Sequence, residues 1–202
     1  MKDAMREMSA IITECWGGDF CDVVMSDAEG LLRTMIDENA GDPKAVRRHT
    51  ETDIFPCISL YRALQGRGIP ADEALAFLDD SWSRRAQEPA RRMGRMLRFA
   101  GLYRLYPSMF RFSAKKGFGE AAGFEARFYD CGRRRCRFDM TRCLFMDTCR
   151  RYGCPELTQC FCHVDDVNNA DLHPRLCWNR TRYMGKGDDV CDFDIYVREE
   201  DR

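Results

Sequence analysis

The chain has 202 residues, of which 45% are apolar and 11% aromatic, so it can form a core and is not a mostly disordered protein. Lys and Arg number 32 against 33 Asp and Glu, and the net charge of −1 leaves no excess of positive charge to attract nucleic acid. No uncharged apolar run approaches the roughly 18 residues that span a bilayer, and residues 1–7 lack the apolar centre of a signal peptide. We therefore expect a soluble, cytoplasmic protein with no transmembrane segment and no nucleic-acid partner.

Cysteine is the residue type that stands out. There are twelve, and nine of them lie between Cys131 and Cys191. Without an export signal, such thiols are typically reduced, and they serve as buried residues, metal ligands or catalytic groups. The C-terminal third is therefore the expected location of the chemistry.

Charge is distributed unevenly along the chain. Residues 1–61 contain 6 basic and 12 acidic residues, whereas residues 62–116 contain 12 basic and 5 acidic ones. These oppositely charged segments are expected to face each other. No repeat or Pro/Gly/Ser linker divides the sequence, so we expect one domain over 1–202, with a helical part (1–116) and a cysteine-rich sheet part (117–202).

The first half predicts helices. One begins at Pro56 and ends at the glycines 66 and 68, and a second runs from Pro70 to Arg85 with acidic residues in its first turn. Residues 91–112 form a basic amphipathic stretch. Such a stretch can lie on an anionic membrane or bind a partner, but more often it packs on the core with its basic side in water, which is the interpretation we adopt.

From residue 124 onward the apolar period changes to two. Residues 124–130 and 135–140 alternate as a hairpin, and residues 177–184 and 190–198 form a second hairpin around the glycine-containing turn 185–189. This alternation turns Cys191 inward and Asp192 to the opposite face. Between the hairpins, a helix capped by Thr141 begins near residue 143, and another begins at Pro155. The prediction is an α+β fold, with N-terminal helices packed on an antiparallel sheet of about four strands.

Reactive residue types are concentrated in the second half of this region: Cys143, Cys160, Cys162, His163, Asp165, Asp166, His173, Arg180, Thr181, Cys191 and Asp192. Structural zinc is disfavoured, because the neighbours Cys160 to His163 point about 100° apart on a helix and no paired CxxC motif exists. For most single cysteines, packing as a small apolar residue is the simpler explanation; this group is Cys57, Cys136, Cys149, Cys160 and Cys177. His49 stands alone in a polar stretch and gives no signal.

The C-terminal third resembles the L-2-amino-thiazoline-4-carboxylic acid hydrolase family. The resemblance covers roughly residues 120–198 and depends on the order and spacing of several short pieces: Cys143 opening a helix, Gly153-Cys154-Pro155-Glu156-Leu157-Thr158, Cys162 with Asp165, His173-Pro174, Arg180-Thr181 and Cys191-Asp192-Phe193. One departure is Tyr183, where such sequences often carry threonine.

The resemblance implies a hydrolase that opens a small cyclic substrate at a C–N/C–S centre by addition of water. It implies Cys162 or Cys191 as nucleophile, Asp165 and His173 as acid–base groups, and Arg180 with Thr181 as the substrate-binding pair. A divalent metal such as zinc stays open, with Cys162, Asp165, His173 and Cys191 as its available ligands. The partner is then a small molecule, and homo-oligomerisation stays open.

Two other interpretations compete with the hydrolase. One is a non-catalytic module that binds a small ligand or a metal and uses the cysteines as a sensor. The other is purely structural, with twelve reduced thiols packed in a core.

Overall fold

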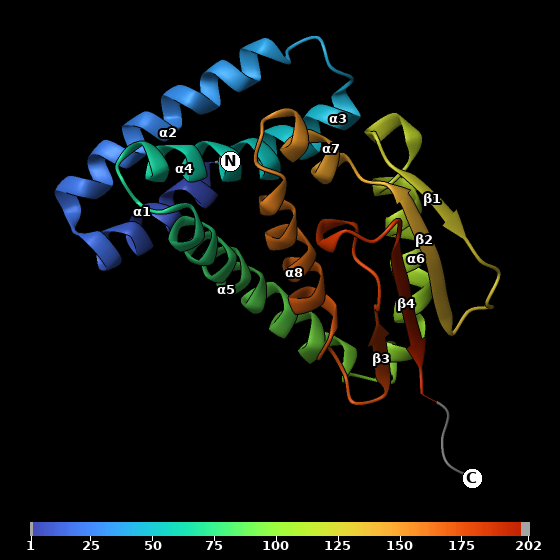
Figure 1. The fold of residues 1–202 in the computed structure, drawn as a ribbon. Helices are drawn as coiled ribbons and strands as arrows, with labels where there is room; N and C mark the ends of the chain where they lie inside the picture. The colour runs from blue at the N-terminus through green and yellow to red at the C-terminus, as the bar shows by residue number, and fades with distance from the viewer. Residues whose placement is uncertain (1, 199–202) are drawn as a thin grey trace.

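The computed structural model describes residues 2–198 and confirms the α+β prediction (Figure 1). The longer helices are α1 (Lys2–Trp16), α2 (Gly18–Glu38), α3 (Lys44–His49), α4 (Phe55–Gly66), α5 (Ala71–Leu97), α6 (Tyr106–Gly117), α7 (Leu144–Arg151) and α8 (Thr158–Asn169). Shorter helical turns are the π-helical η1 (Thr50–Ile54) and the 3-10 segments η2 (Leu102–Leu105), η3 (Glu120–Ala122), η4 (Pro155–Leu157) and η5 (Met184–Lys186). The strands are β1 (Glu125–Phe128), β2 (Arg135–Arg142), β3 (Leu176–Asn179) and β4 (Cys191–Val197).

Helix α4 lies at the centre of the helical part. Nine of its twelve residues are buried, and α2 packs along it. Two polar contacts tie it to the C-terminal half: the Tyr61 hydroxyl donates to Oε1 of Glu156 at 2.6 Å, and Nη2 of Arg62 donates to the carbonyl oxygen of Gly153 at 2.8 Å. The helical and sheet parts are therefore joined through α4.

The oppositely charged segments do meet, as expected. Arg67 pairs with Asp27 at 2.6 Å, and Arg85 on α5 pairs with Glu7 on α1 at 3.0 Å. Both pairs link residues 1–61 to residues 62–116.

Helix α5 is longer than predicted. It continues past Arg85 and through Pro89 to Leu97, so the basic stretch 91–112 contains the end of α5, a turn, η2 and the start of α6. Pro89 removes one backbone hydrogen bond within α5 but does not end the helix. Our interpretation of 91–112 as core-facing is only partly correct, since some of its apolar side chains are buried and others point into water.

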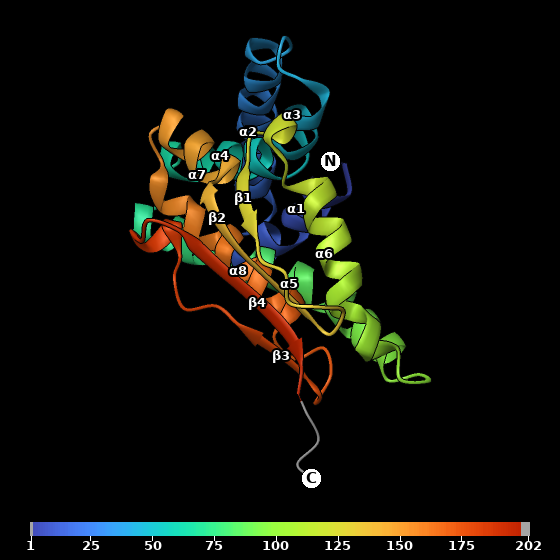
Figure 2. The same cartoon turned by 90° about the vertical axis from the view of Figure 1, so that its right-hand side faces the viewer.

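The four strands form an antiparallel sheet in the order β1-β2-β4-β3. Its inner face is apolar, and Phe138 on β2 pairs with Phe193 on β4 with ring centroids 4.6 Å apart. Helix α6 packs on this face, where Phe110 contacts Phe138 and Trp178. Figure 2 shows the sheet toward the viewer with the helices behind it. The predicted inward side of β4 is confirmed, because Cys191, Phe193 and Ile195 are buried.

Two local expectations are wrong. Strand β3 ends at Asn179 rather than 184, because the Asp192 carboxylate accepts hydrogen bonds from the backbone N–H groups of Thr181 and Arg182 at 2.8 and 2.6 Å. Those groups are thus withdrawn from strand pairing. Thr141 does not cap α7, since it lies within β2, and Cys143 is the residue that precedes the helix.

Over the part of the chain that the structure describes, no helix is long and apolar enough to cross a membrane. All twelve cysteines are free thiols.

Candidate active site

A cavity of about 460 Å³ lies between the helices and the inner face of the sheet. Its walls come from the α3–η1 junction, α5, α8, β2, the start of β4 and the segment that joins β3 to β4. Four residues predicted for the site line it together: Cys162, Asp165, Arg180 and Cys191. The topology brings them together because α8 runs beside the inner face of the sheet (Figure 1).

Helix α8 supplies Cys162 and Asp165. They are one turn apart, so both point to the same side of the helix. The neighbouring segment approaches closely here: a Cβ at Gly185 would lie 3.1 Å from Sγ of Cys162 and 3.1 Å from Cγ2 of Thr158. Glycine at 185 thus allows η5 to close one side of the cavity against the thiol.

Cys191 is the first residue of β4 and is only 2% exposed. Its sulfur accepts a hydrogen bond from the backbone N–H of Met184 at 3.2 Å. A hydrogen bond from the Cys162 thiol lowers the pKa of Cys191, and the N–H of Met184 and the Arg180 guanidinium lower it further, against the opposing effect of burial. Conversely, this hydrogen bond and burial raise the pKa of Cys162. These directions, together with the N–H of Met184, favour Cys191 as the sulfur that ionises and Cys162 as the thiol that donates to it.

Arg180 lies just beyond β3 with its side chain 2% exposed. The guanidinium carbon is 4.4 Å from the ring centroid of Tyr183 and 4.3 Å from that of Phe193, so the planar group is held between two aromatic faces. Nη1 donates to the carbonyl oxygen of Cys162 at 3.2 Å and to Oδ2 of Asp165 at 3.3 Å. Nε is buried without a hydrogen-bond partner in the described residues.

The charge of Arg180 is compensated locally. Burial opposes the charged form, but the Asp165 carboxylate and the Cys162 and Cys191 sulfurs favour it and raise the pKa of Arg180. The guanidinium therefore stays protonated over the whole pH range in which a cysteine ionises.

For Asp165, in contrast, the environment disfavours the charged form. Desolvation raises its pKa to about 6, although the adjacent Arg180 lowers it. The side chain is 41% exposed, and the residue lines the cavity. A carboxyl group that titrates near neutral pH and opens onto a cavity can accept and return a proton.

His173 does not join this group. It lies in the loop before β3, where its ring stacks on Tyr103 at 4.2 Å and its Nδ1 accepts a hydrogen bond from the backbone N–H of Arg175. The expectation that it converges with the other four residues is wrong. The reason is that the loop after α8 carries it beyond the end of the helix, toward η2.

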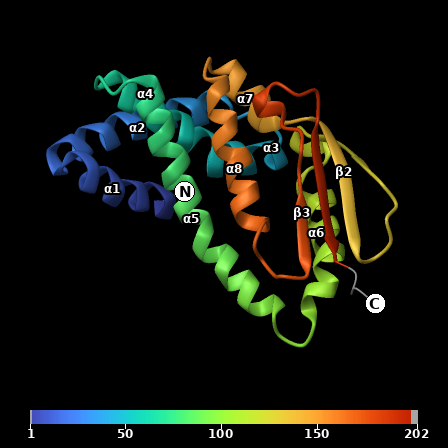
Figure 3. The same ribbon diagram turned by 60° about the horizontal axis from the view of Figure 1, so that its bottom comes forward.

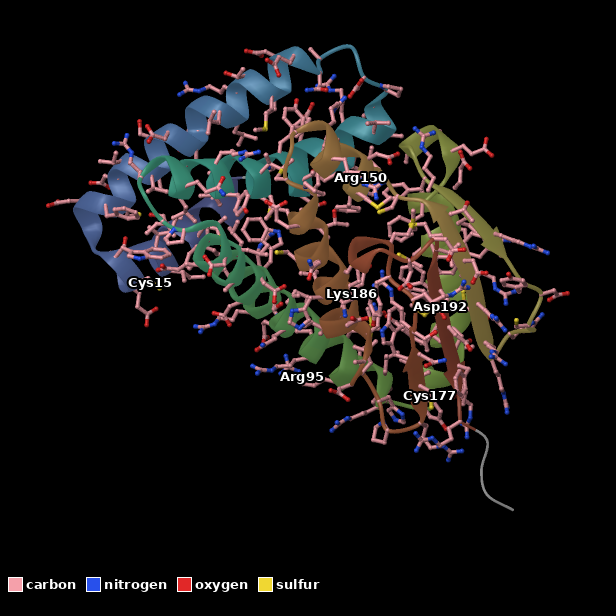
Figure 4. All side chains as sticks on the ribbon, viewed as in Figure 1. Cys15, Arg95, Arg150, Cys177, Lys186 and Asp192 are labelled. Carbon is pink, nitrogen blue, oxygen red and sulfur yellow. The ribbon has the colours of Figure 1, made fainter. Side chains whose placement is uncertain are left out.

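Thr181 also lies away from the cavity. Its hydroxyl donates to Oδ2 of Asp192 at 2.6 Å, on the side of the sheet opposite Cys191. In Figure 4, Asp192 is labelled on the sheet and Cys177 near its lower end. Thr181 and Asp192 together fix the segment that carries Arg180.

The donor groups do not fit a metal ion. Within residues 2–198, no three Cys, His, Asp or Glu side chains are arranged so that they could hold one. Removal of His173 from the expected ligand set leaves two thiols and one carboxylate, whose positions are already fixed by the contacts to Arg180.

The opposite wall of the cavity holds residues that the sequence did not single out. His49 and Asp53 come from the α3–η1 junction, and Arg85 comes from α5. The ring nitrogen Nε2 of His49 is 3.1 Å from the carbonyl oxygen of Gly117, and the ring lies against Phe124. Burial raises the pKa of Asp53, while His49 and Arg85 lower it. No sequence pattern indicated these residues, because they lie far along the chain from the cysteine-rich part.

The remaining cysteines behave largely as predicted. Cys57, Cys136, Cys149 and Cys160 are fully buried and do not line the cavity, whereas Cys177 is half-buried. Burial raises the pKa of Cys57 and Cys160, which keeps these thiols neutral. They are packed in the core.

The fold and the site together define an α+β protein whose helix–sheet cavity holds a polarised thiol pair, a carboxyl group and a buried guanidinium. The chain belongs to the L-2-amino-thiazoline-4-carboxylic acid hydrolase family, whose model matches residues 47–195. This span includes all the cavity residues described above. Comparison with curated proteins and with solved structures gave no match.

Proposed function

We propose that this protein is a cysteine-dependent hydrolase that opens small cyclic C–N/C–S substrates such as 2-aminothiazoline-4-carboxylate. The observation that carries the proposal is the Cys191 sulfur, which lines a cavity and accepts a hydrogen bond from the backbone N–H of Met184 at 3.2 Å. Cys162 and the Arg180 guanidinium lower its pKa further. A thiolate held in this way is a ready nucleophile at neutral pH. Membership of the family supports this chemistry.

The reaction takes two steps. The Cys191 thiolate adds to the amidine-like C2 of the ring, the ring nitrogen takes up a proton, and the C2–S bond breaks as the ring sulfur leaves as a thiolate. The intermediate is an S-linked isothiourea on Cys191. Water then adds to the same carbon, the Cys191 thiolate is expelled, and an N-carbamoyl cysteine is released; the net change is the addition of one water molecule.

Asp165 is the proposed proton carrier. With a pKa raised to about 6, it can give a proton to the substrate nitrogen in the first step and take one from water in the second. Cys162 donates a hydrogen bond to the nucleophile, so it holds the thiolate and is not itself the attacking group.

Arg180 and Arg85 have different proposed roles. Arg180 is held between two rings and bonded to Asp165, so we assign it to stabilising the thiolate. Arg85 lines the cavity from α5 and pairs with Glu7 through Nε, and its Nη groups are the proposed partners of the substrate carboxylate, a role that the resemblance implied for Arg180. Loss of Arg85 should raise KM, whereas loss of Arg180 should raise the pKa of the nucleophile.

The cavity volume also bears on the substrate. At about 460 Å³ it falls within the range of sites for drug-sized ligands, and much of its wall is aromatic, including Phe124, Phe145 and Phe161. Assays should therefore include thiazolines with an apolar substituent beside the unsubstituted acid.

The twelve free thiols further favour a reducing compartment, and we propose the cytoplasm.

The test is turnover of these substrates by the purified, reduced protein, together with intact-mass measurement for the covalent intermediate. Cys191→Ala should abolish both, and Cys177→Ala, on β3 outside the cavity, should leave both unchanged. Turnover by Cys191→Ala would refute the mechanism. Binding of the substrates without turnover by the wild type would favour a non-catalytic ligand-binding module.

A further inference from the structure

The exposed apolar side chains gather at one corner of the molecule. Seven large apolar residues of the described chain are exposed, and five of them lie within 17 residues of sequence: Met96, Phe99, Leu105, Met109 and Phe112. The two aromatic ones are the most exposed, Phe99 at 74% and Phe112 at 71%. We call residues 90–119, which contain this group, the basic corner.

Three of the five exposed residues lie along the outward side of α6 and the residue before it. Leu105, at the end of η2, and Met109 and Phe112, on α6, follow the spacing i, i+4, i+7, so they form one stripe. The opposite side of the same helix is the one that packs on the sheet, where Phe110 contacts Trp178. The stripe therefore does not belong to the hydrophobic core, because other residues of α6 make the contacts to the sheet.

The corner carries charge of one sign only. Residues 90–119 contain eight basic residues and no acidic residue. Four of the eight form ion pairs or hydrogen bonds within the protein: Arg92 and Arg95 lie near Glu88, Arg91 donates to Oε1 of Gln87, and Arg111 donates to backbone carbonyl oxygens. Arg104 and Lys115 lie over the rings of Tyr103 and Phe128. Within residues 2–198, no ion pair engages the four basic residues nearest the apolar stripe and the turn, which are Arg98, Arg104, Lys115 and Lys116.

The corner projects from the body of the protein. Between α5 and η2 the chain reverses through Ala100 and Gly101, both with positive φ (49° and 73°), and Figure 3 shows this turn at the tip of the molecule. Phe99 lies at the turn. In Figure 4, Arg95 is labelled on the outer side of α5, away from the sheet. The apolar side chains thus lie on a protruding corner with cations around them.

We infer that the basic corner docks the protein on an anionic phospholipid bilayer. Exposed aromatic and aliphatic residues beside Arg and Lys that form no ion pair are the composition of peripheral membrane-binding helices, in which the apolar side chains enter the interface and the cations meet lipid headgroups. Charge complementarity is the argument for this partner, because no acidic side chain within the corner offsets its eight cations. A protruding corner can insert into a lipid surface without a matching groove.

The exposed apolar residues of the corner do not line the cavity. The α5 residues that line the cavity end at Pro89, and within residues 90–119 only Phe118 lines it. Substitutions at Phe99 and Phe112 should therefore leave turnover unchanged, and the inference stands or fails independently of the proposed function.

The test is co-sedimentation of the full chain with vesicles of phosphatidylcholine alone or mixed with phosphatidylglycerol. We expect binding to the mixed vesicles only, weakened by salt. The double variant Phe99→Ser/Phe112→Ser should lose at least about tenfold in affinity, since each side chain removed from the interface contributes apolar burial. Lys115→Gln/Lys116→Gln should also lose affinity, by about fivefold per charge.

The matched control is Val23→Ser/Leu31→Ser, because these are the two exposed large apolar residues on the acidic helix α2. This variant should bind like the wild type, and circular dichroism should show all variants folded, since the altered side chains are exposed. Three results would overturn the inference. They are equal binding to neutral and mixed vesicles, no binding to either, and unchanged binding of the Phe99→Ser/Phe112→Ser variant. Sedimentation analysis of the protein alone distinguishes a further outcome: self-association that these substitutions abolish, without vesicle binding, would assign the corner to a second copy of the chain and also overturn it.

Discussion

The polarised thiol pair can be tested by removing only its donor. In Cys162→Ala, the Cys191 thiolate loses one hydrogen bond but keeps the one from Met184 and the favourable charge of the Arg180 guanidinium. A hydrogen bond to a charged group stabilises by about 1.5–3 kcal/mol, and a pKa change of one corresponds to about 1.4 kcal/mol. The pKa of Cys191 should therefore rise by about 1 to 2 in this variant.

The assay is the pH dependence of alkylation at Cys191 by iodoacetamide, with the modified peptide quantified by mass spectrometry because the chain has twelve thiols. Alkylation requires the thiolate, so the rate of the wild type should fall as pH drops through a value well below that of an ordinary cysteine. In Cys162→Ala the fall should occur at higher pH. Cys160→Ala is the matched control, because it deletes a buried thiol from the same helix outside the cavity. Identical profiles for wild type and Cys162→Ala, with both proteins folded, would refute the assigned hydrogen bond.

Three further predictions concern the site and the core. Gly185→Ala should lower the free energy of unfolding by about 1–3 kcal/mol in urea denaturation, because its Cβ would lie 3.1 Å from each of two side-chain atoms. The control is Gly30→Ala in α2, whose Cβ would meet no atom within 4 Å and which should not destabilise the protein. Asp165→Asn should lower kcat by about 10²-fold or more in the substrate assay while Cys191 remains reactive. Because the pKa of Asp165 is raised, the wild type should lose stability as pH rises through about 6. Thermal melts of Asp165→Asn should lack this loss, and a parallel pH dependence of the two proteins would contradict the prediction. Tyr61→Phe should cost about 1.5–3 kcal/mol, since a buried hydroxyl no longer bonds the carboxylate of Glu156; an unchanged urea midpoint would show that this bond contributes nothing.

Local sequence patterns were sufficient to predict the bounds and buried side of elements that depend mainly on their own residues. Strand β4 was predicted within one residue at each end, and the inward side of Cys191 followed from the alternation, because the period of a strand fixes which side chains face the core. The start of α4 was predicted within one residue of Pro56 for a similar reason. The ends of α5 and β3 were not predicted, since α5 continues through Pro89 to Leu97 and the end of β3 depends on the side chain of Asp192.

The site shows the same division. Cys162, Asp165, Arg180 and Cys191 could be grouped because they lie on neighbouring elements of one sequence segment. The contribution of the helical part could not be predicted, because His49 belongs to a helix about 140 residues before Cys191. It lines the same cavity only through the packing of the helical part on the sheet part. His173 was misplaced because closeness in sequence does not determine the direction of a loop.

The cavity lies between two parts of the chain that are tied together through α4. Its walls belong to both parts, and the contacts of Tyr61 and Arg62 link them. A ligand that fits this space binds the assembled chain and not either part alone, so it favours the folded state as a whole by mass action. Thermal unfolding of the entire protein therefore reports on occupancy, and a melting-temperature screen of cyclic thioimidates would rank candidate substrates even when none is turned over.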